Sequence, residues 1–180
     1  LFCSCSENTI ILGYAGPLTG GYSDLGVQGR NGAVLAVEEI NETGLINGKQ
    51  FSLIVKDDKN SPERAKEVDR QLIKQNVTAI IGHMTSSPSV AALPVAERAG
   101  VIMLSPTTST PKLSNKKEMF FRVQGATDTP ALALGKYSRR SLGLDTINLL
   151  SDTANSAYSE PFKANFIKAF RSVGGTIGNE

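Results

Sequence analysis

Short apolar runs alternate along this chain with longer segments whose apolar residues recur at helical spacing. An apolar run over residues 9–13 precedes a helical pattern over 26–43, and a second run over 51–55 precedes a pattern that opens at Ser61-Pro62. Further strands are predicted at 77–82, 101–105 and 119–123, with a helix over 87–99. Because strands that alternate with helices form parallel sheets, the sequence predicts an α/β fold: a doubly wound, Rossmann-like parallel sheet covered on both faces.

The residues after 123 begin a second unit of the same kind. A short polar connection at 124–127 interrupts the alternation and is typical of a hinge. A helix from Thr129-Pro130, a strand over 146–150 and a helix striped by phenylalanines follow it. We therefore predict an N-terminal tail over 1–8, a first α/β lobe over 9–123, and a hinge with a partial second lobe over 124–180.

This partial second lobe would leave strand edges and an apolar helix stripe uncovered. Uncovered edges and apolar stripes favour pairing with further protein. We therefore expect either a fragment of a longer protein or a homodimer completed through the tail.

The composition is that of an ordinary globular protein, with 180 residues, 40% hydrophobic and 20% charged. The 19 basic and 17 acidic residues are dispersed and give a net charge of +2, which does not indicate nucleic acid or an acidic membrane surface as a partner. No apolar run approaches the roughly 20 residues that cross a bilayer.

Both cysteines lie in the first five residues, so no disulfide can join distant elements. The segment from Leu1 to Cys5 is similar to the end of a bacterial lipoprotein signal, with Ser4 before a lipidated Cys5. The alternative is a terminal remnant that carries two thiols. The pair Cys3 and Cys5 alone is too sparse for a zinc site, and no metal is predicted.

Two hydroxyl-rich turns follow successive predicted strands. The first is Thr85-Ser86-Ser87, followed by Pro88, which suits the first position of a helix; the second lies within residues 105–111. The unpaired amides and positive dipole end of a helix start favour an anion. Since ligands bind beyond the carboxyl ends of parallel strands, we expect both turns to converge on one crevice that holds a carboxylate.

Other interpretations of these residues need no ligand. Serines and threonines at helix starts are usually caps, and Thr107 and Ser109 fit a solvated turn. Asp57 and Asp58 are predicted to cap the turn that follows them. His83 is the only histidine and lacks a recognisable nucleophile partner, so we interpret it as a structural or cleft-rim residue. For the same reason no enzyme is predicted. No phosphate-loop fingerprint accompanies Gly20-Gly21, so no nucleotide cofactor is predicted.

Several short motifs together carry a resemblance to a known family. They are Gly16-Pro17-Leu18-Thr19-Gly20, Gly26 with Gly32-Ala33, Asp57-Asp58, Ile81-Gly82 and Ser105-Pro106. In these the chain resembles type I periplasmic solute-binding proteins, specifically the branch that binds leucine, isoleucine and valine for ABC transporters. The resemblance implies two α/β lobes that close on an amino acid or related zwitterion and deliver it to an ABC permease. It also implies a periplasmic or extracellular location, where a lipidated Cys5, if the first residues are a lipoprotein signal, would anchor the protein to the membrane.

The resemblance also assigns binding roles to individual residues. It places the carboxylate-binding hydroxyl on Ser86, flanked by Thr85 and Ser87. Thr107 would offer a backbone carbonyl, and Ser109 a hydroxyl and an amide, to the ligand's ammonium and carboxylate. The tyrosine of the second lobe corresponds to Tyr158. Leu25 stands where the family often has an aromatic residue, which leaves the side-chain pocket and the identity of the solute open.

Two other functions share this fold and stay open at this point. The same lobes form ligand-sensing extracellular domains of receptors of the histidine kinase or chemoreceptor type. An enzyme on the same fold is a third alternative, which turnover of a bound amide or ester would reveal.

Overall fold

The computed structural model describes residues 9–44, 46, 48–115 and 119–179, and it divides into two compact units. Unit 1 takes the described residues up to Thr108 together with 119–123. Unit 2 takes Ser109–Asn115 and the described residues from Gln124 onward. Cys3 and Cys5, and with them the predicted lipidation, lie outside the described residues.

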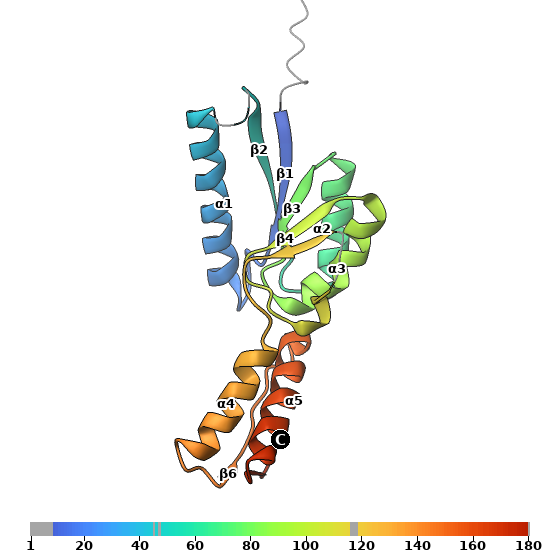
Figure 1. Ribbon diagram of the computed structural model, residues 1–180. Helices are drawn as coiled ribbons and strands as arrows, with labels where there is room; N and C mark the ends of the chain where they lie inside the picture. The colour runs from blue at the N-terminus through green and yellow to red at the C-terminus, as the bar shows by residue number, and fades with distance from the viewer. Residues whose placement is uncertain (1–8, 45, 47, 116–118, 180) are drawn as a thin grey trace, which may run out of the picture. The chain divides into compact units, whose positions relative to one another are not determined.

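Unit 1 is a five-stranded parallel sheet with three helices (Figure 1). The strands run in the order β2-β1-β3-β4-β5, and every neighbouring pair is parallel. The predicted α/β class is therefore confirmed. The elements of unit 1 are β1 (Thr9–Gly16), α1 (Ser23–Thr43), β2 (Gln50–Asp57), α2 (Pro62–Lys74), β3 (Ala79–Gly82), α3 (Ser86–Ala99), β4 (Ile102–Ser105) and β5 (Phe120–Arg122).

The two faces of the sheet are buried by different helices, since successive strand residues point to opposite faces. On one face, Tyr14 packs with Ala33 of α1 and with Met84. On the other, Ala15 packs with Val68 and Leu72 of α2 and their apolar neighbours. Figure 1 shows α1 on one side of the sheet and α2 with α3 on the other. This two-sided burial explains why the strands read as nearly continuous apolar runs.

Local sequence fixes most helix ends as predicted. The hydroxyl of Ser61 accepts from the Arg64 amide at 3.3 Å, and Pro62 is the first residue of α2. The first helix ends at Gly44, which adopts the left-handed conformation and donates its amide to Ile40. Two predicted helix starts are wrong: α3 begins at Ser86, and the helix predicted from Thr129-Pro130 begins at Asp128. Pro88 and Pro130 therefore lie within the first turn and not at its first position. Prolines are tolerated there because first-turn amides have no partner inside the helix.

The strand order reverses direction around β1, which lies between β2 and β3. The chain leaves β1 for one edge of the sheet and then crosses to the other side through α2. In open α/β sheets of this order, ligands bind at such a switch point, outside the carboxyl ends of the strands. The loops that follow β1, β3 and β4 are therefore the candidate ligand-binding part of unit 1.

Unit 2 has two long helices and two short strands. A short 3₁₀ turn over Pro111–Leu113 precedes α4 (Asp128–Arg140), β6 (Thr146–Ile147), α5 (Ser156–Ser172) and β7 (Thr176–Ile177). β6 and β7 pair in parallel, and Phe166 and Phe170 of the predicted stripe are buried and stacked. The predicted strand over 146–150 is too long, because after Ile147 the chain makes irregular bonds, such as Leu149 N–H to the Asn179 carbonyl. None of the described helices has the length and apolar character to span a bilayer.

Candidate functional site

Asp57 ties the loop after β1 to the end of β2. Its carboxylate accepts from the Leu18 amide at 2.8 Å, the Thr19 hydroxyl at 2.6 Å and the Lys59 amide at 2.9 Å. Burial alone would raise the pKa of Asp57, but these hydrogen bonds outweigh it and hold the pKa below its usual value. Asp58 likewise accepts from the Asn60 amide at 2.8 Å. The predicted capping of this turn by Asp57 and Asp58 is confirmed.

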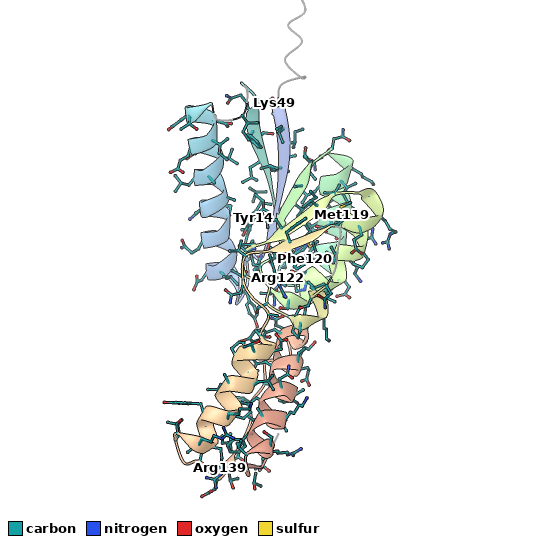
Figure 2. All side chains as sticks on the ribbon, viewed as in Figure 1. Tyr14, Lys49, Met119, Phe120, Arg122 and Arg139 are labelled. Atoms are coloured by element: carbon teal, nitrogen blue, oxygen red, sulfur yellow. The ribbon has the colours of Figure 1, made fainter. Side chains whose placement is uncertain are left out.

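The loop after β1 is also held against the start of α1. A Cβ on Gly26 would collide with the Pro17 carbonyl oxygen, so only glycine allows this approach. Tyr14, which Figure 2 labels beside α1, donates its hydroxyl to the Gly26 carbonyl at 2.5 Å. Burial of this ring raises the pKa of Tyr14 to about 12, so the hydroxyl remains a donor at all physiological pH values.

The turn Thr85-Ser86-Ser87 starts α3 at the carboxyl end of β3, and all three side chains are buried. Thr85 is the residue before the first turn, yet its side chain makes no capping hydrogen bond. Its hydroxyl donates to the Asn60 side-chain oxygen at 2.5 Å instead. Thr85 therefore does not act as a side-chain cap of α3.

The loop after β4 is bonded directly to the end of β3. The Thr107 hydroxyl donates to the Met84 carbonyl at 2.5 Å, one residue before Thr85. The Ser105 hydroxyl donates to the His83 carbonyl at 2.6 Å and accepts the Thr108 amide at 3.0 Å. The turn at residues 85–87 and the part of the second turn over residues 105–108 thus lie side by side in unit 1. Their roles toward a ligand stay a prediction.

Behind these turns, His83 lies between two carboxylates in the interior of unit 1. Its Nδ1 is 2.6 Å from Oδ2 of Asp58, and its Nε2 is 3.2 Å from Oδ1 of Asp69; all three side chains are fully buried. Burial would lower the pKa of His83, but its hydrogen bonds and charge attraction to both aspartates raise it to about 9. His83 is therefore structural, as one of the two predicted interpretations has it, and does not lie at a rim.

The predicted site residues are distributed over both units. Unit 1 holds Thr85, Ser86, Ser87 and Thr107, as well as Leu25, which is exposed in the first turn of α1. Ser109 and Tyr158 belong to unit 2.

Local contacts in unit 2 fix both of these residues. The carbonyl of Ser109 accepts from the Thr127 amide at 2.9 Å. Tyr158 lies in the first turn of α5, where its ring stacks on Phe162 with centroids 5.9 Å apart. Both residues are thus held by their own unit.

Sequence reasoning did not find Asp69 or Ser89. A signal for Asp69 was present, because it follows Ala65 by four residues and shares the buried face of α2 with Val68 and Leu72. An acidic residue on such a face calls for a buried partner. No comparable signal marks Ser89, whose hydroxyl lies 2.6 Å from that of Thr108.

Comparison with known proteins gives consistent results. Residues 9–180 match the family described as periplasmic binding protein. A leucine-, isoleucine-, valine-, threonine- and alanine-binding protein of Pseudomonas aeruginosa is 29% identical over 172 residues, which are 95% of this chain and 46% of that protein. The chain thus spans about half the length of the relatives it matches.

Solved structures are similar over the same extent. A leucine-binding protein, LivK, of Thermotoga maritima superposes with a TM-score of 0.86 at 26% identity, over 95% of this chain and 48% of that one. LivJ of Streptococcus pneumoniae, a branched-chain amino acid transporter substrate-binding protein solved with isoleucine, gives 0.85 at 28% identity over the same shares.

Proposed function

This chain belongs to the periplasmic binding protein family, which confirms the resemblance read from its short motifs, and we propose that it binds an amino acid or related zwitterion for an ABC transporter. In this proposal the solute is a branched-chain or similar amino acid, and the acceptor of the loaded protein is an ABC permease. The names of the relatives support this solute class. In the same proposal the protein binds and delivers its solute and catalyses no reaction. It does so in the periplasm or outside the cell.

One observation carries the proposal: a hydroxyl-rich helix start at the carboxyl end of β3, placed beside a second polar loop. The first turn of α3 brings Ser86 and Ser87 to the carboxyl end of β3, and Thr107 is bonded to the residue just before that turn. The amides at a helix start and the positive dipole end of α3 suit a carboxylate. We assign the carboxylate to Ser86, with Thr85 and Ser87 beside it.

The second loop and the second unit would complete the contacts to the solute's ammonium and carboxylate. In the proposal, Thr107 contributes its backbone carbonyl, because its hydroxyl is already bonded to Met84. Ser109 contributes its hydroxyl and amide, because its carbonyl is already bonded to Thr127. Tyr158 would close over the solute, and Leu25 would contact its side chain. We propose that units 1 and 2 correspond to the first lobe and the beginning of the second.

A thermal-shift screen tests this proposal on the complete polypeptide that carries these residues. Leucine, isoleucine and valine are compared with amides, urea and aromatic acids, and a binder raises the melting temperature by mass action. Each hydrogen bond to a charged group contributes about 1.5–3 kcal/mol, so the Ser86→Ala/Ser109→Ala double variant should weaken binding at least about 100-fold. Calorimetric titration of the double variant with the strongest binder measures this loss.

The control is Ser172→Ala, since that hydroxyl donates to the nearby Ala169 carbonyl at the end of α5. We expect wild-type affinity from this control. Unchanged affinity in the double variant would remove the site assignment, and the absence of any binder among these solutes would remove the proposed function.

A further inference from the structure

The carbonyl oxygen of His83 is a meeting point for hydroxyls from three segments of unit 1. Ser105 at the end of β4 donates to it at 2.6 Å. The Thr108 hydroxyl lies 3.2 Å from it, and the Ser89 hydroxyl lies 3.3 Å from it and 2.6 Å from that of Thr108. A carbonyl accepts two hydrogen bonds, so Ser105 takes one and Thr108 the other, while Ser89 donates at 2.8 Å to the Thr85 carbonyl. This network of hydroxyls joins the end of β3, the first turn of α3 and the loop after β4.

The imidazole ring of His83 is held by two carboxylates. Asp58 follows β2 and Asp69 lies in the middle of α2, and each places a carboxylate oxygen within hydrogen-bond distance of one ring nitrogen. Ionised carboxylates only accept hydrogen bonds, so both ring nitrogens must donate, as an imidazolium does. Among the described residues, Oδ2 of Asp69 has no hydrogen-bond partner, which leaves excess negative charge beside the ring.

We propose that His83 is a positioning residue for the candidate solute site: its ring is clamped between Asp58 and Asp69, and its carbonyl oxygen sets the spacing between the Thr85–Ser87 turn and the Ser105–Thr108 loop. This inference rests on the proposed function. Thr85 lies two residues after His83 in the chain. Thr107 directly precedes Thr108, whose hydroxyl is bonded to the His83 carbonyl. Loosening the clamp should therefore separate the two turns without touching a side chain that meets the solute.

The ring's charge can be observed directly, because His83 is the only histidine of the chain. In nitrogen-15 spectra of the ring we expect two protonated nitrogens from pH 5 to 8 and titration only near pH 9. The facing groups are Asp58 and Asp69; Tyr14, near Asp58, stays neutral because its pKa is about 12. Asp69→Asn should lower the titration midpoint by at least about one pH unit. The matched control on α2, Glu67→Gln, changes an exposed carboxylate and should leave it unchanged.

The positioning role is tested by a pair of substitutions at Thr108. Valine keeps the shape of threonine but removes the hydroxyl, whereas serine keeps the hydroxyl and removes the methyl group. If the hydroxyl positions the loop, Thr108→Val should weaken solute affinity about 5- to 10-fold and Thr108→Ser should stay within about 2-fold of wild type. A role in packing alone would give the reverse order.

The affinity of the wild type for its solute should be constant from pH 6 to 8 and decline toward pH 9. In Asp69→Asn this decline should move to lower pH together with the histidine titration. A histidine that titrates near 6.5, or a Thr108→Val variant that binds as tightly as wild type, would overturn the inference while leaving the proposed function intact. A wild-type protein that binds no solute would instead overturn the proposed function and the positioning role, while the spectra still report on the clamp.

Discussion

Replacement of His83 by alanine is expected to lower the free energy of unfolding by about 4 kcal/mol, because it leaves Asp58 and Asp69 buried without their cation. Loss of one partner from a buried ion pair typically costs about 3–5 kcal/mol, and the missing ring adds a cavity. This is a large part of the about 5–15 kcal/mol that keeps a typical domain folded. Urea unfolding at pH 6, followed by circular dichroism, measures the change.

The same charge predicts how stability depends on pH. The pKa of His83 is about 9 in the folded chain and 6.5 as its ordinary value. Because the folded pKa is raised, the stabilisation is fully present below about pH 6.5 and is lost as the pH rises through about 9. We expect the urea midpoint of the wild type to fall across this window and that of His83→Ala to stay flat.

Glu67→Gln serves as the control for this set, since its exposed ion pair with Arg64 should contribute less than about 1 kcal/mol. A loss below about 1 kcal/mol in His83→Ala, or a stability profile that rises between pH 6.5 and 9, would contradict the buried charged cluster.

Substitution of Gly82 by alanine is expected to cost about 3 kcal/mol of unfolding free energy. Gly82 has a φ of 148°, in a region that other residues rarely adopt, and an added Cβ would collide with the Ala15 carbonyl oxygen. Ala15 and Gly82 are register partners of β1 and β3, so the collision pushes apart the two strands that flank the switch point. Thermal and urea unfolding measure the loss.

Gly32→Ala provides a matched glycine elsewhere in unit 1. Gly32 lies in the interior of α1, and an added Cβ there would meet nothing within 4 Å. Alanine favours a helix over glycine by about 1 kcal/mol, so this substitution should stabilise the chain. Equal effects of the two substitutions would show that the backbone approach at Gly82 does not constrain the sheet.

The sequence predicted the architecture well because one physical rule governs it along the whole chain. Buried parallel strands read as apolar runs, and amphipathic helices between them read at helical spacing, so β1 to β5 and their helices were all anticipated. Local chemistry fixed several ends, such as the Ser61 cap and Gly44. The adjacency of the two hydroxyl turns followed from the parallel order of β3 and β4 alone.

What the sequence did not reveal depends on contacts between distant residues. The clamp on His83 joins residues 14 and 25 positions away, and no local pattern encodes such a pairing. The start of α3 was misplaced because Pro88 suits any first-turn position. The Thr85 side chain, in the turn that was expected to begin α3, is bonded to Asn60 in the loop after β2. That contact could be found only in three dimensions.

We propose that the first turn of α3 and the loop after β4 hold the charged end of one small solute. This proposal can be tested by titrating the nitrogen-15-labelled polypeptide with leucine and following assigned amide resonances. We expect saturable shifts that are largest at the amides of Ser86, Ser87 and Ser109. Saturable binding with its largest shifts on other segments, and none at these three amides, would contradict it.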